Sequence, residues 1–173
     1  MKTKITYILE AALSLFSTLG YSGISTRMIA SKAAVSEGLI FRHFTNKKGL
    51  LNALLEIAKE DIAELYGTAL KLEHPKVFLK QLLSVPFQIK ENNNTLWRFV
   101  YSHQWFESKL MELISTPIQE RVVESFKSIG VSDPHTEADS FLILLEGLTT
   151  RMLLKNVSNS FSIAEHIARK FNL

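Results

Sequence analysis

The chain has 173 residues, a formal net charge of +3 and no cysteine, which excludes disulfide bonds and thiolate metal sites. Hydrophobic residues make up 46% of it, which excludes a disordered chain and allows a sizeable core. Residues 1–50 carry seven basic and two acidic groups, and the remainder carries thirteen basic and fifteen acidic groups. A basic N-terminal third favours binding to a polyanion, and chance segregation of surface charge is the alternative.

The first twenty residues resemble a signal peptide only superficially. Glu10 interrupts their apolar stretch and no convincing cleavage site follows, so an amphipathic helix fits better. The longest uncharged run, residues 11–26, is too short and too rich in glycine to span a bilayer. We therefore expect no membrane association and a cytoplasmic location.

Three helices are predicted in the N-terminal third. Apolar residues recur at helical spacing over residues 3–19, and Gly20 ends that helix. Thr26 is placed to cap a short second helix, and Ser36 is placed to cap a third over Glu37–Phe44.

Longer helices are predicted beyond this point. Asn46 can cap a helix over residues 47–70. Pro75 is typical of a helix first turn and opens a helix to about Lys90, after which residues 91–94 form a polar break. Residues 95–113 are helical by pattern, in one or two pieces.

The C-terminal third is helical by the same criteria. A capping box with a first-turn proline at Thr116–Gln119 opens a helix that Gly130 ends. A strongly apolar helix follows over residues 134–156, and a capping box at Ser162–Glu165 opens the last one. With no stretch of period two, the chain is expected to be all-α, with about nine helices.

The segment from Thr26 to Phe44 has the pattern of a helix-turn-helix. Two short capped helices are joined by a tight turn at Ala34–Ser36, and Ala30 supplies the small side chain needed where the second helix crosses the first. In this geometry the first helix bridges the DNA backbone and the second enters the major groove.

A longer ordered set of residues surrounds this motif: Ile8–Ala12, Leu15–Phe16, Gly20–Tyr21, Thr26, Ile29–Ala30, Ala33–Ser36, Gly38, His43–Phe44, Lys47 and Leu50–Leu51. In these residues the sequence resembles the TetR family of transcriptional regulators. The remaining two-thirds of the chain is similar to the family only in helical content and length. The resemblance implies a three-helix, homeodomain-like DNA-binding domain over residues 1–46 and a helical regulatory and dimerisation domain over residues 47–173, connected by helix 47–70.

The resemblance also implies a set of DNA contacts. Thr26 would cap its helix and meet a phosphate, and Lys47 would contact another phosphate. Glu37 either accepts a hydrogen bond from a cytosine amino group or only favours the helix N-terminus. The full set is Thr26, Arg27, Ser36, Glu37, Gly38, Leu39, Phe41, Arg42, His43 and Lys47.

Two positions depart from the family pattern. Phe41 stands where tyrosine is usual, so the hydroxyl contact to the DNA backbone is lost, although the ring can still touch a thymine methyl group. Ala34 stands where glycine is usual in the turn, and an alanine at positive φ costs about 1–2 kcal/mol unless the turn differs.

The helix over residues 134–156 is apolar nearly all round and must be covered on more than one side. The resemblance implies that the last two helices pair with a second copy, and a wholly intramolecular core is the alternative. Two heads then meet half-sites about one helical turn apart. The expected interface residues are Phe141, Leu142, Leu145, Leu148, Met152, Ile163, Ile167 and Phe171.

Aromatic residues are concentrated in the segment 96–106, as either core packing or a pocket for a largely apolar small molecule. His103 and Glu107 are spaced to share a metal, but no third ligand accompanies them, so neither a metal site nor a cofactor is expected. The candidate ligand-binding residues are Tyr66, Phe78, Leu82, Trp97, Tyr101, His103, Trp105 and Phe106.

Together these features predict a bacterial, sequence-specific regulator of transcription that is not an enzyme. We expect a homodimeric repressor that binds a near-palindromic site in double-stranded DNA and is released by a small-molecule effector. One alternative is a regulator of the same fold that a protein partner controls. A small all-helical enzyme is a remote alternative, because no Ser/His/Asp set or Gly-rich phosphate loop is recognisable.

Overall fold

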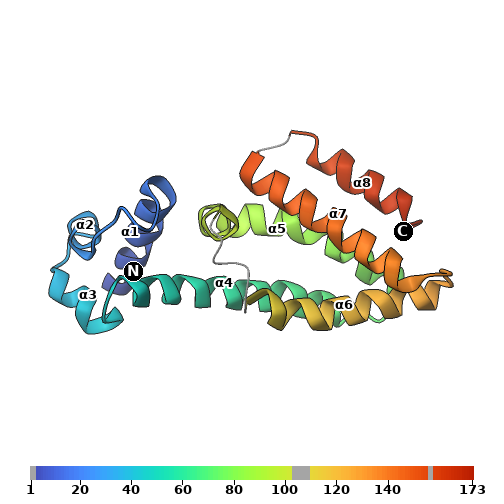
Figure 1. The fold of residues 1–173 in the computed structure, drawn as a ribbon, viewed down its shortest axis with the longest axis horizontal. Helices are drawn as coiled ribbons and strands as arrows, with labels where there is room; N and C mark the ends of the chain where they lie inside the picture. The colour runs from blue at the N-terminus through green and yellow to red at the C-terminus, as the bar shows by residue number, and fades with distance from the viewer. Residues whose placement is uncertain (1–2, 103–109, 156–157) are drawn as a thin grey trace.

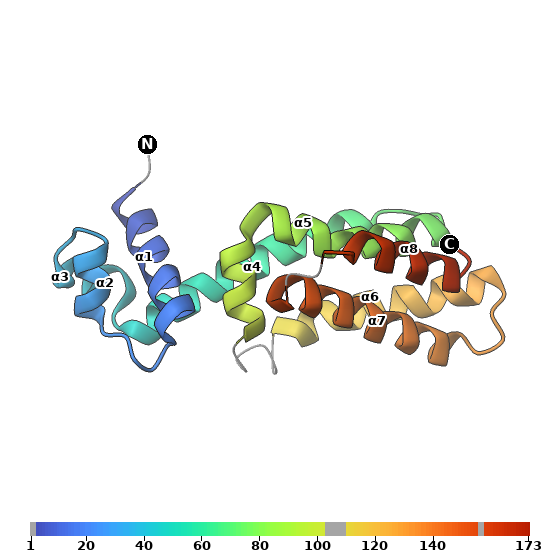
Figure 2. The same cartoon turned by 90° about the horizontal axis from the view of Figure 1, so that it is seen from above.

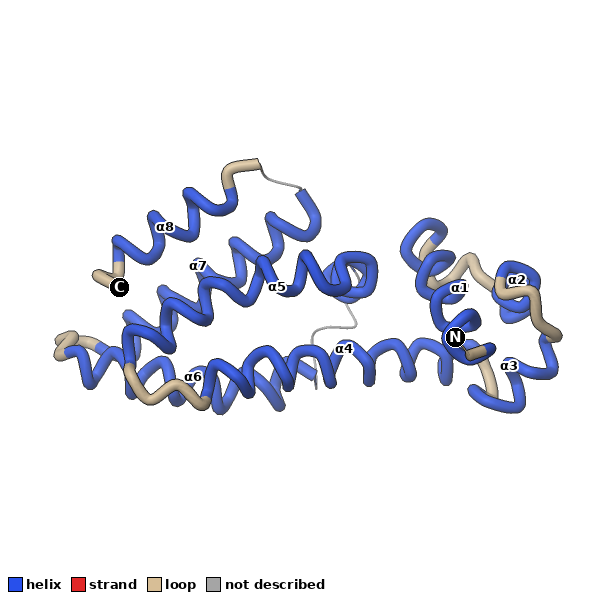
Figure 3. Tube along the Cα trace, turned by 180° about the vertical axis from the view of Figure 1, so that it is seen from behind, coloured by secondary structure: helices blue, strands red, loops and turns tan. Residues whose placement is uncertain are grey.

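Helices form the framework of the chain, which a computed structural model describes over residues 3–102, 110–155 and 158–173. No strand occurs within those ranges, and the all-α fold class is confirmed (Figure 3). In chain order the helices are α1 (Lys4–Leu19), α2 (Thr26–Lys32), α3 (Glu37–Phe44), α4 (Lys47–Leu70), α5 (Pro75–Ser102), α6 (Leu110–Ile129), α7 (Pro134–Lys155) and α8 (Ser160–Lys170).

Helices α1–α3, which we call the head, gather at one end of an elongated molecule (Figure 1). The remaining helices α5–α8 we call the body, and helix α4 leaves the head and runs beside α5 and α6. The core of the head is made by the inward faces of α1–α3 and the start of α4, and its central side chains Ile8, Phe16, Ile29, Ile40 and Leu50 are fully buried. Burial of each such side chain stabilises the fold by about 1.5–3 kcal/mol.

The apolar cluster of the head continues into the body. The ring of Phe16 in α1 stacks on the ring of Phe99 in α5, with centroids 5.8 Å apart. Ala58 and Ile62 extend the cluster along α4 as far as Trp97. The head is therefore packed directly against α5 as well as being joined to the body through α4.

A second apolar cluster fills the body. At its centre the rings of Phe126, Phe141 and Phe171 contact one another with centroid distances of 5.3–5.9 Å. These three residues come from α6, from α7 and from the C-cap position directly after α8, so the triad packs the C-terminus of the chain into the core. Arg121 closes one end by donating to the carbonyl oxygens of Leu72 and Glu73.

Two helix boundaries that the sequence suggested, one in α5 and one in α6, are wrong. Helix α5 continues through residues 91–94, where a polar break was expected. It also contains Pro86, and Figure 2 shows that α5 changes direction along its length, as expected where an internal proline removes a backbone hydrogen bond. Helix α6 already begins at Leu110, so Pro117 lies inside it rather than at the expected start over Thr116–Gln119.

Most other helix ends follow local sequence chemistry. Gly20 ends α1 at a φ of 76°, and Gly130 follows α6 at 87°, as predicted. Asn46 caps α4 as predicted, its side-chain oxygen accepting from the Gly49 N–H at 2.9 Å. The expected cap at Ser162 is wrong, because α8 begins at Ser160. Among the described residues no helix is both long and apolar enough to cross a bilayer.

Candidate nucleic-acid interface

Helices α2 and α3 are joined by the tight turn that the sequence predicts. The Val35 N–H donates to the Ala30 carbonyl at 3.0 Å and the Ala34 N–H donates to the Ser31 carbonyl at 3.2 Å. Ala34 has a φ of 53°, so the alanine occupies the left-handed conformation expected of the usual glycine. The turn therefore keeps its geometry and stores backbone strain.

The N-termini of α2 and α3 are bonded to each other. The hydroxyl of Thr26 donates to the Glu37 carboxylate at 2.6 Å, and both residues are half-buried. The expectation that Thr26 caps α2 is wrong, because Ser25 is the cap and its hydroxyl accepts from the Met28 N–H. Thr26 and Glu37 thus form a bridge that holds the angle between the two helices.

The outward face of α3 is where the predicted base contacts gather. Gly38, Arg42 and His43 are exposed and the Phe41 side chain is 48% exposed, whereas Leu39 is half-buried against the head core. Ser36 precedes the helix as its N-cap residue, as predicted, but its side chain makes no capping hydrogen bond. Glycine at position 38 leaves the first turn of α3 open, and a Cβ added there would have no atom within 4 Å.

Exposed cationic side chains also lie in the first turns of α2 and α4. Arg27, in the first turn of α2, is exposed and, like Arg42 and Lys48, makes no ion pair or hydrogen bond among the described residues. Lys48 was not among the predicted contacts, and neither was Met28, which is 40% exposed next to Arg27. No signal in the sequence pointed to either residue, because the apolar periodicity that identifies a helix does not mark individual exposed positions.

Lys47, which the resemblance implies as a phosphate contact, bonds to the head itself in this structure. Its side chain is half-buried, and its ammonium donates to the carbonyl oxygens of Tyr21 at 2.9 Å and Ile24 at 2.8 Å. The same ammonium lies 4.4 Å from the centre of the Tyr21 ring. In this structure the charge faces the loop between α1 and α2, and the phosphate contact that the resemblance implies stays a prediction.

A close approach joins α3 to α4. A Cβ on Gly49 would overlap the carbonyl oxygen of Phe44 and lie 2.9 Å from its carbonyl carbon, so only glycine fits. Thr45, between the two helices, has a φ of 66° and its N–H donates to the Phe41 carbonyl at 3.0 Å. The orientation of α3 relative to α4 is therefore tightly constrained.

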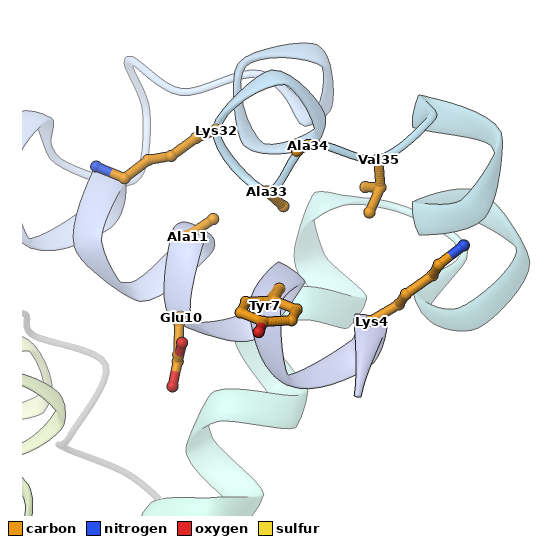
Figure 4. A pocket seen from close by; sticks show the side chains of 8 residues that line it. All are labelled: Lys4, Tyr7, Glu10, Ala11, Lys32, Ala33, Ala34 and Val35. Carbon is orange, nitrogen blue, oxygen red and sulfur yellow. The ribbon is translucent and has the colours of Figure 1, made fainter. Parts of the chain in front are cut away.

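A groove of about 580 Å³ lies on the head between α1 and the turn after α2. Figure 4 shows Tyr7 in the middle of the groove, with Lys4 and Lys32 extending from opposite ends. Ala33 and Val35 contribute apolar surface from the turn. Both lysines are exposed and add to the positive charge of the head.

The predicted ligand-binding residues are divided between the two cores. Phe78 and Leu82 are fully buried in the body cluster, whereas Trp97 is buried in the cluster that extends from the head. Tyr66 packs against both clusters, and Tyr101 packs against the cluster containing Trp97. The remaining three predicted residues, His103, Trp105 and Phe106, lie outside the described residues, as does the His103–Glu107 pair.

Burial dominates the chemistry of the two tyrosines. It raises the pKa of Tyr66 to about 12. The pKa of Tyr101 is also raised, first by burial and then by the nearby Tyr66 and Glu146. Both phenols are therefore neutral at physiological pH.

A cavity of about 380 Å³ lies between α4 and α5, beside Trp97. Its polar walls differ from the apolar pocket that the sequence suggested. Only Trp97 belongs to the predicted set, and the other lining residues are Asp61, Glu64, Leu65, Thr68, Gln88 and Ile89. Sequence reasoning missed the α4 residues because charged positions on a helix are ordinarily solvent-facing.

Most of the predicted interface residues point into the core of their own chain. Their side chains are therefore unavailable to a partner, and that part of the prediction is corrected. Leu142 and Ile163 are half-buried, and Ile143 and Phe161 are each 67% exposed. The residues that are at most 5% exposed are Phe141, Leu145, Leu148, Met152, Ile167 and Phe171.

The exposed face of α3, the adjacent cations and the strained turn define a helix-turn-helix DNA-binding protein. A family model described as "Bacterial regulatory proteins, tetR family" matches residues 8–54. The HTH-type transcriptional regulator YvkB of Bacillus subtilis is 31% identical over 81% of this chain and 78% of its own length. The chain therefore belongs to the TetR family of transcriptional regulators.

Two further comparisons extend over most of the chain. The nucleoid occlusion factor SlmA of Aliivibrio fischeri is 31% identical over 89% of this chain and 80% of its own length. The crystal structure of AibR in complex with isovaleryl coenzyme A and operator DNA matches 97% of each chain with a TM-score of 0.72. At 18% identity this structural likeness concerns the fold.

Proposed function

We propose that the protein is a dimeric repressor whose two heads bind a near-palindromic DNA site and release it when a small molecule binds the body. The observation that carries the proposal is the outward face of α3, where Phe41, Arg42 and His43 are exposed beside Gly38. This face belongs to the end of the molecule that lies away from the body (Figure 2).

The role proposed for each side chain in DNA binding follows from its chemistry. Arg42 can pair with the edge of a guanine, and the ring of Phe41 can contact a thymine methyl group. Arg27 at the start of α2 supplies a contact to the phosphate backbone, which positions the head without reading sequence. We assign residues 1–46 to the DNA-binding domain and residues 47–173 to the regulatory domain.

Dimerisation is proposed through the outward faces of α7 and α8. Ile143 and Phe161 expose large apolar side chains there, and the Phe161 ring lies 6.2 Å from the ring of Phe87 on α5. Covering these side chains with a second copy removes apolar surface from water. The resulting pair of heads can bind two half-sites spaced by one helical turn of DNA.

A small-molecule effector is proposed for the body. AibR, whose fold is similar, was crystallised with a coenzyme A thioester and operator DNA together. In this chain the cavity beside Trp97 borders α4, which is the helix that joins the body to the head. A ligand that fits one position of α4 better than another shifts the balance between DNA-binding and released states.

Control by a protein partner is the second candidate. It is favoured by the complete burial of Phe78, Leu82 and Trp97, which fill the space that an aromatic pocket would need. A screen of small molecules by thermal unfolding separates the two candidates. A compound that raises the unfolding midpoint and weakens DNA binding supports effector control, and failure of every compound class favours a partner.

The DNA-binding function is tested by selecting fragments of genomic DNA and measuring binding to the recovered site and to a scrambled site. Arg42→Ala should lower affinity for the recovered site by about tenfold, within the 1–3 kcal/mol typical of a base-reading arginine. Arg98→Ala is the matched control, because Arg98 is an exposed arginine on the body helix α5. Equal affinity for both sites, or equal effects of the two substitutions, would contradict the proposal.

A further inference from the structure

The groove between α1 and the turn after α2 is a second surface of the head, distinct from the outward face of α3. Lys4, Tyr7 and Ala11 are spaced three and four positions apart, so α1 presents them on one side. Lys32 ends α2, and the turn Ala33–Val35 forms the other wall (Figure 4). Because α1 and α2 pack against each other, the groove is already formed in the free chain.

Apolar surface forms the middle of this groove. The Tyr7 side chain is 48% exposed, and Ala11, one turn further along α1, is buried beside it. Ala33 and Val35 are half-buried and point toward Tyr7 from the turn (Figure 4). An apolar patch with a polar rim marks an interaction site, and tyrosine is among the residues that contribute most to protein–protein binding. The middle of the groove therefore suits an apolar side chain of a partner.

Positive charge lies at both ends of the apolar surface. Lys4 and Lys32 are exposed, extend from opposite ends of the groove and make no ion pair or hydrogen bond among the described residues. Glu10 is the single carboxylate among the lining residues. A DNA backbone would use the lysines but leave the apolar surface uncovered, since phosphate contacts rely on charge and hydrogen bonds. Acidic side chains on either side of an apolar one match both features.

We propose that this groove docks an acidic segment of a protein partner, with an apolar side chain against Tyr7 and acidic side chains beside Lys4 and Lys32, and that docking opposes DNA binding. The turn Ala33–Val35 leads directly into α3, and an acidic occupant reduces the positive potential that attracts DNA to the head. The opposition rests on the proposed DNA-binding function, whereas docking itself does not. A partner bound here acts on the head without passing through the cavity of the body.

Random peptides displayed on phage supply the probe. They are selected on the full chain and, in parallel, on the double variant Tyr7→Ala/Lys32→Gln. Both positions are exposed, so the variant should keep its fold, which circular dichroism checks. We expect the unsubstituted chain to enrich peptides with acidic residues on either side of an apolar one, and the double variant to lose that enrichment.

Fluorescence anisotropy with one enriched, labelled peptide then measures each contribution on the DNA-free chain. Lys4→Gln and Lys32→Gln should each weaken binding by about two- to fivefold, as expected for an exposed ion pair. Tyr7→Ala should weaken it by about tenfold or more, as expected for an aromatic residue at the centre of an interface. Lys80→Gln is the matched control, because Lys80 is an exposed lysine on the body helix α5 and should have no effect.

The opposition to DNA binding is measured with the same peptide. A saturating duplex should weaken peptide binding, and the peptide should weaken duplex binding by the same factor, because coupling between two sites is reciprocal. A peptide that instead covers α3 as a general polyanion would lose more affinity with Arg42→Ala than with Tyr7→Ala, and that result would exclude docking in the groove.

Other outcomes also overturn the proposal. Docking is refuted if the selection enriches no acidic peptide, or enriches the same peptides on the double variant. Peptide affinity that is equal with and without duplex would refute the opposition to DNA. If Lys4→Gln and Lys32→Gln each lower the salt slope of duplex binding by about 0.9 without affecting the peptide, the lysines contact phosphate instead. A chain that binds the peptide but no duplex would contradict the proposed DNA-binding function and not the docking.

Discussion

Replacing Gly49 by alanine tests the junction between the recognition helix α3 and the connecting helix α4. Intrinsic helix propensity alone favours alanine over glycine within a helix by about 0.8–1 kcal/mol. The structure predicts the opposite, namely that alanine at position 49 lowers the stability of the folded chain. The added Cβ would overlap the Phe44 carbonyl oxygen, lie 2.9 Å from the carbonyl carbon and lie 3.5 Å from the Phe44 Cα.

The size of the stability loss in Gly49→Ala depends on which atoms must move to make room for the Cβ. The overlapped atoms belong to the backbone, so no rotamer change relieves the contact and the α3–α4 junction itself has to shift. Insertion of one carbon into a packed region costs about 1–3 kcal/mol, and a backbone clash belongs at the upper end. After subtraction of the propensity gain, we expect a net loss of about 2 kcal/mol. For a domain of this size that corresponds to a midpoint lower by about 4–8 °C.

Gly67→Ala is the matched control, because Gly67 lies in the same helix and has no atom within 4 Å of an added Cβ. It should be more stable than the unsubstituted chain by about 0.5–1 kcal/mol. Urea unfolding followed by circular dichroism measures both variants, and an unchanged m-value confirms that stability itself has changed. Gly49→Ala as stable as Gly67→Ala would refute the proposed close contact.

Three further predictions concern stability, each measured by urea unfolding. Ala34→Gly should stabilise the chain by about 0.5–1 kcal/mol, since relief of positive-φ strain exceeds the added entropy of the unfolded chain; lower stability would show that the turn is unstrained. Thr26→Val should cost about 1.5–3 kcal/mol by removing the donor to the Glu37 carboxylate, and no loss would show that the bridge is energetically idle. The pKa of Tyr66 is raised by burial from 10.0 to about 12, so the folded chain binds more protons than the unfolded chain between these values. Stability should therefore fall as pH rises through this window and fall less steeply in Tyr66→Phe; equal slopes would contradict the burial.

Helix ends in the head were predictable because they depend on residues within a few positions of one another. Gly20 can adopt a positive φ, Asn46 can reach the backbone three residues ahead, and the turn at Ala34 keeps its conformation even without glycine. These interactions are local, so the residues that make each of them lie close together in the sequence. The same holds for the positive charge of the first fifty residues and for the exposed Arg42 on α3.

Proline and polar signals were less reliable in the body. Pro117 was expected to open a helix and residues 91–94 were expected to separate two, yet both lie inside helices. An internal proline removes one hydrogen bond, and burial of a long helix against its neighbours can outweigh that loss. Helix α5 packs against α1, α4, α6, α7 and α8, and none of those contacts can be read from the residues around position 91.

The sequence by itself determined which segments are helical in the head, where its turn lies and which end of the chain is basic. Only the tertiary structure decided which way each helix faces. Phe141 and Phe171 could have met a partner, but the rotation of α7 and α8 turns them into their own core. Likewise, the ammonium of Lys47 bonds to carbonyl oxygens of a loop more than twenty positions earlier, a contact that depends on packing between distant segments.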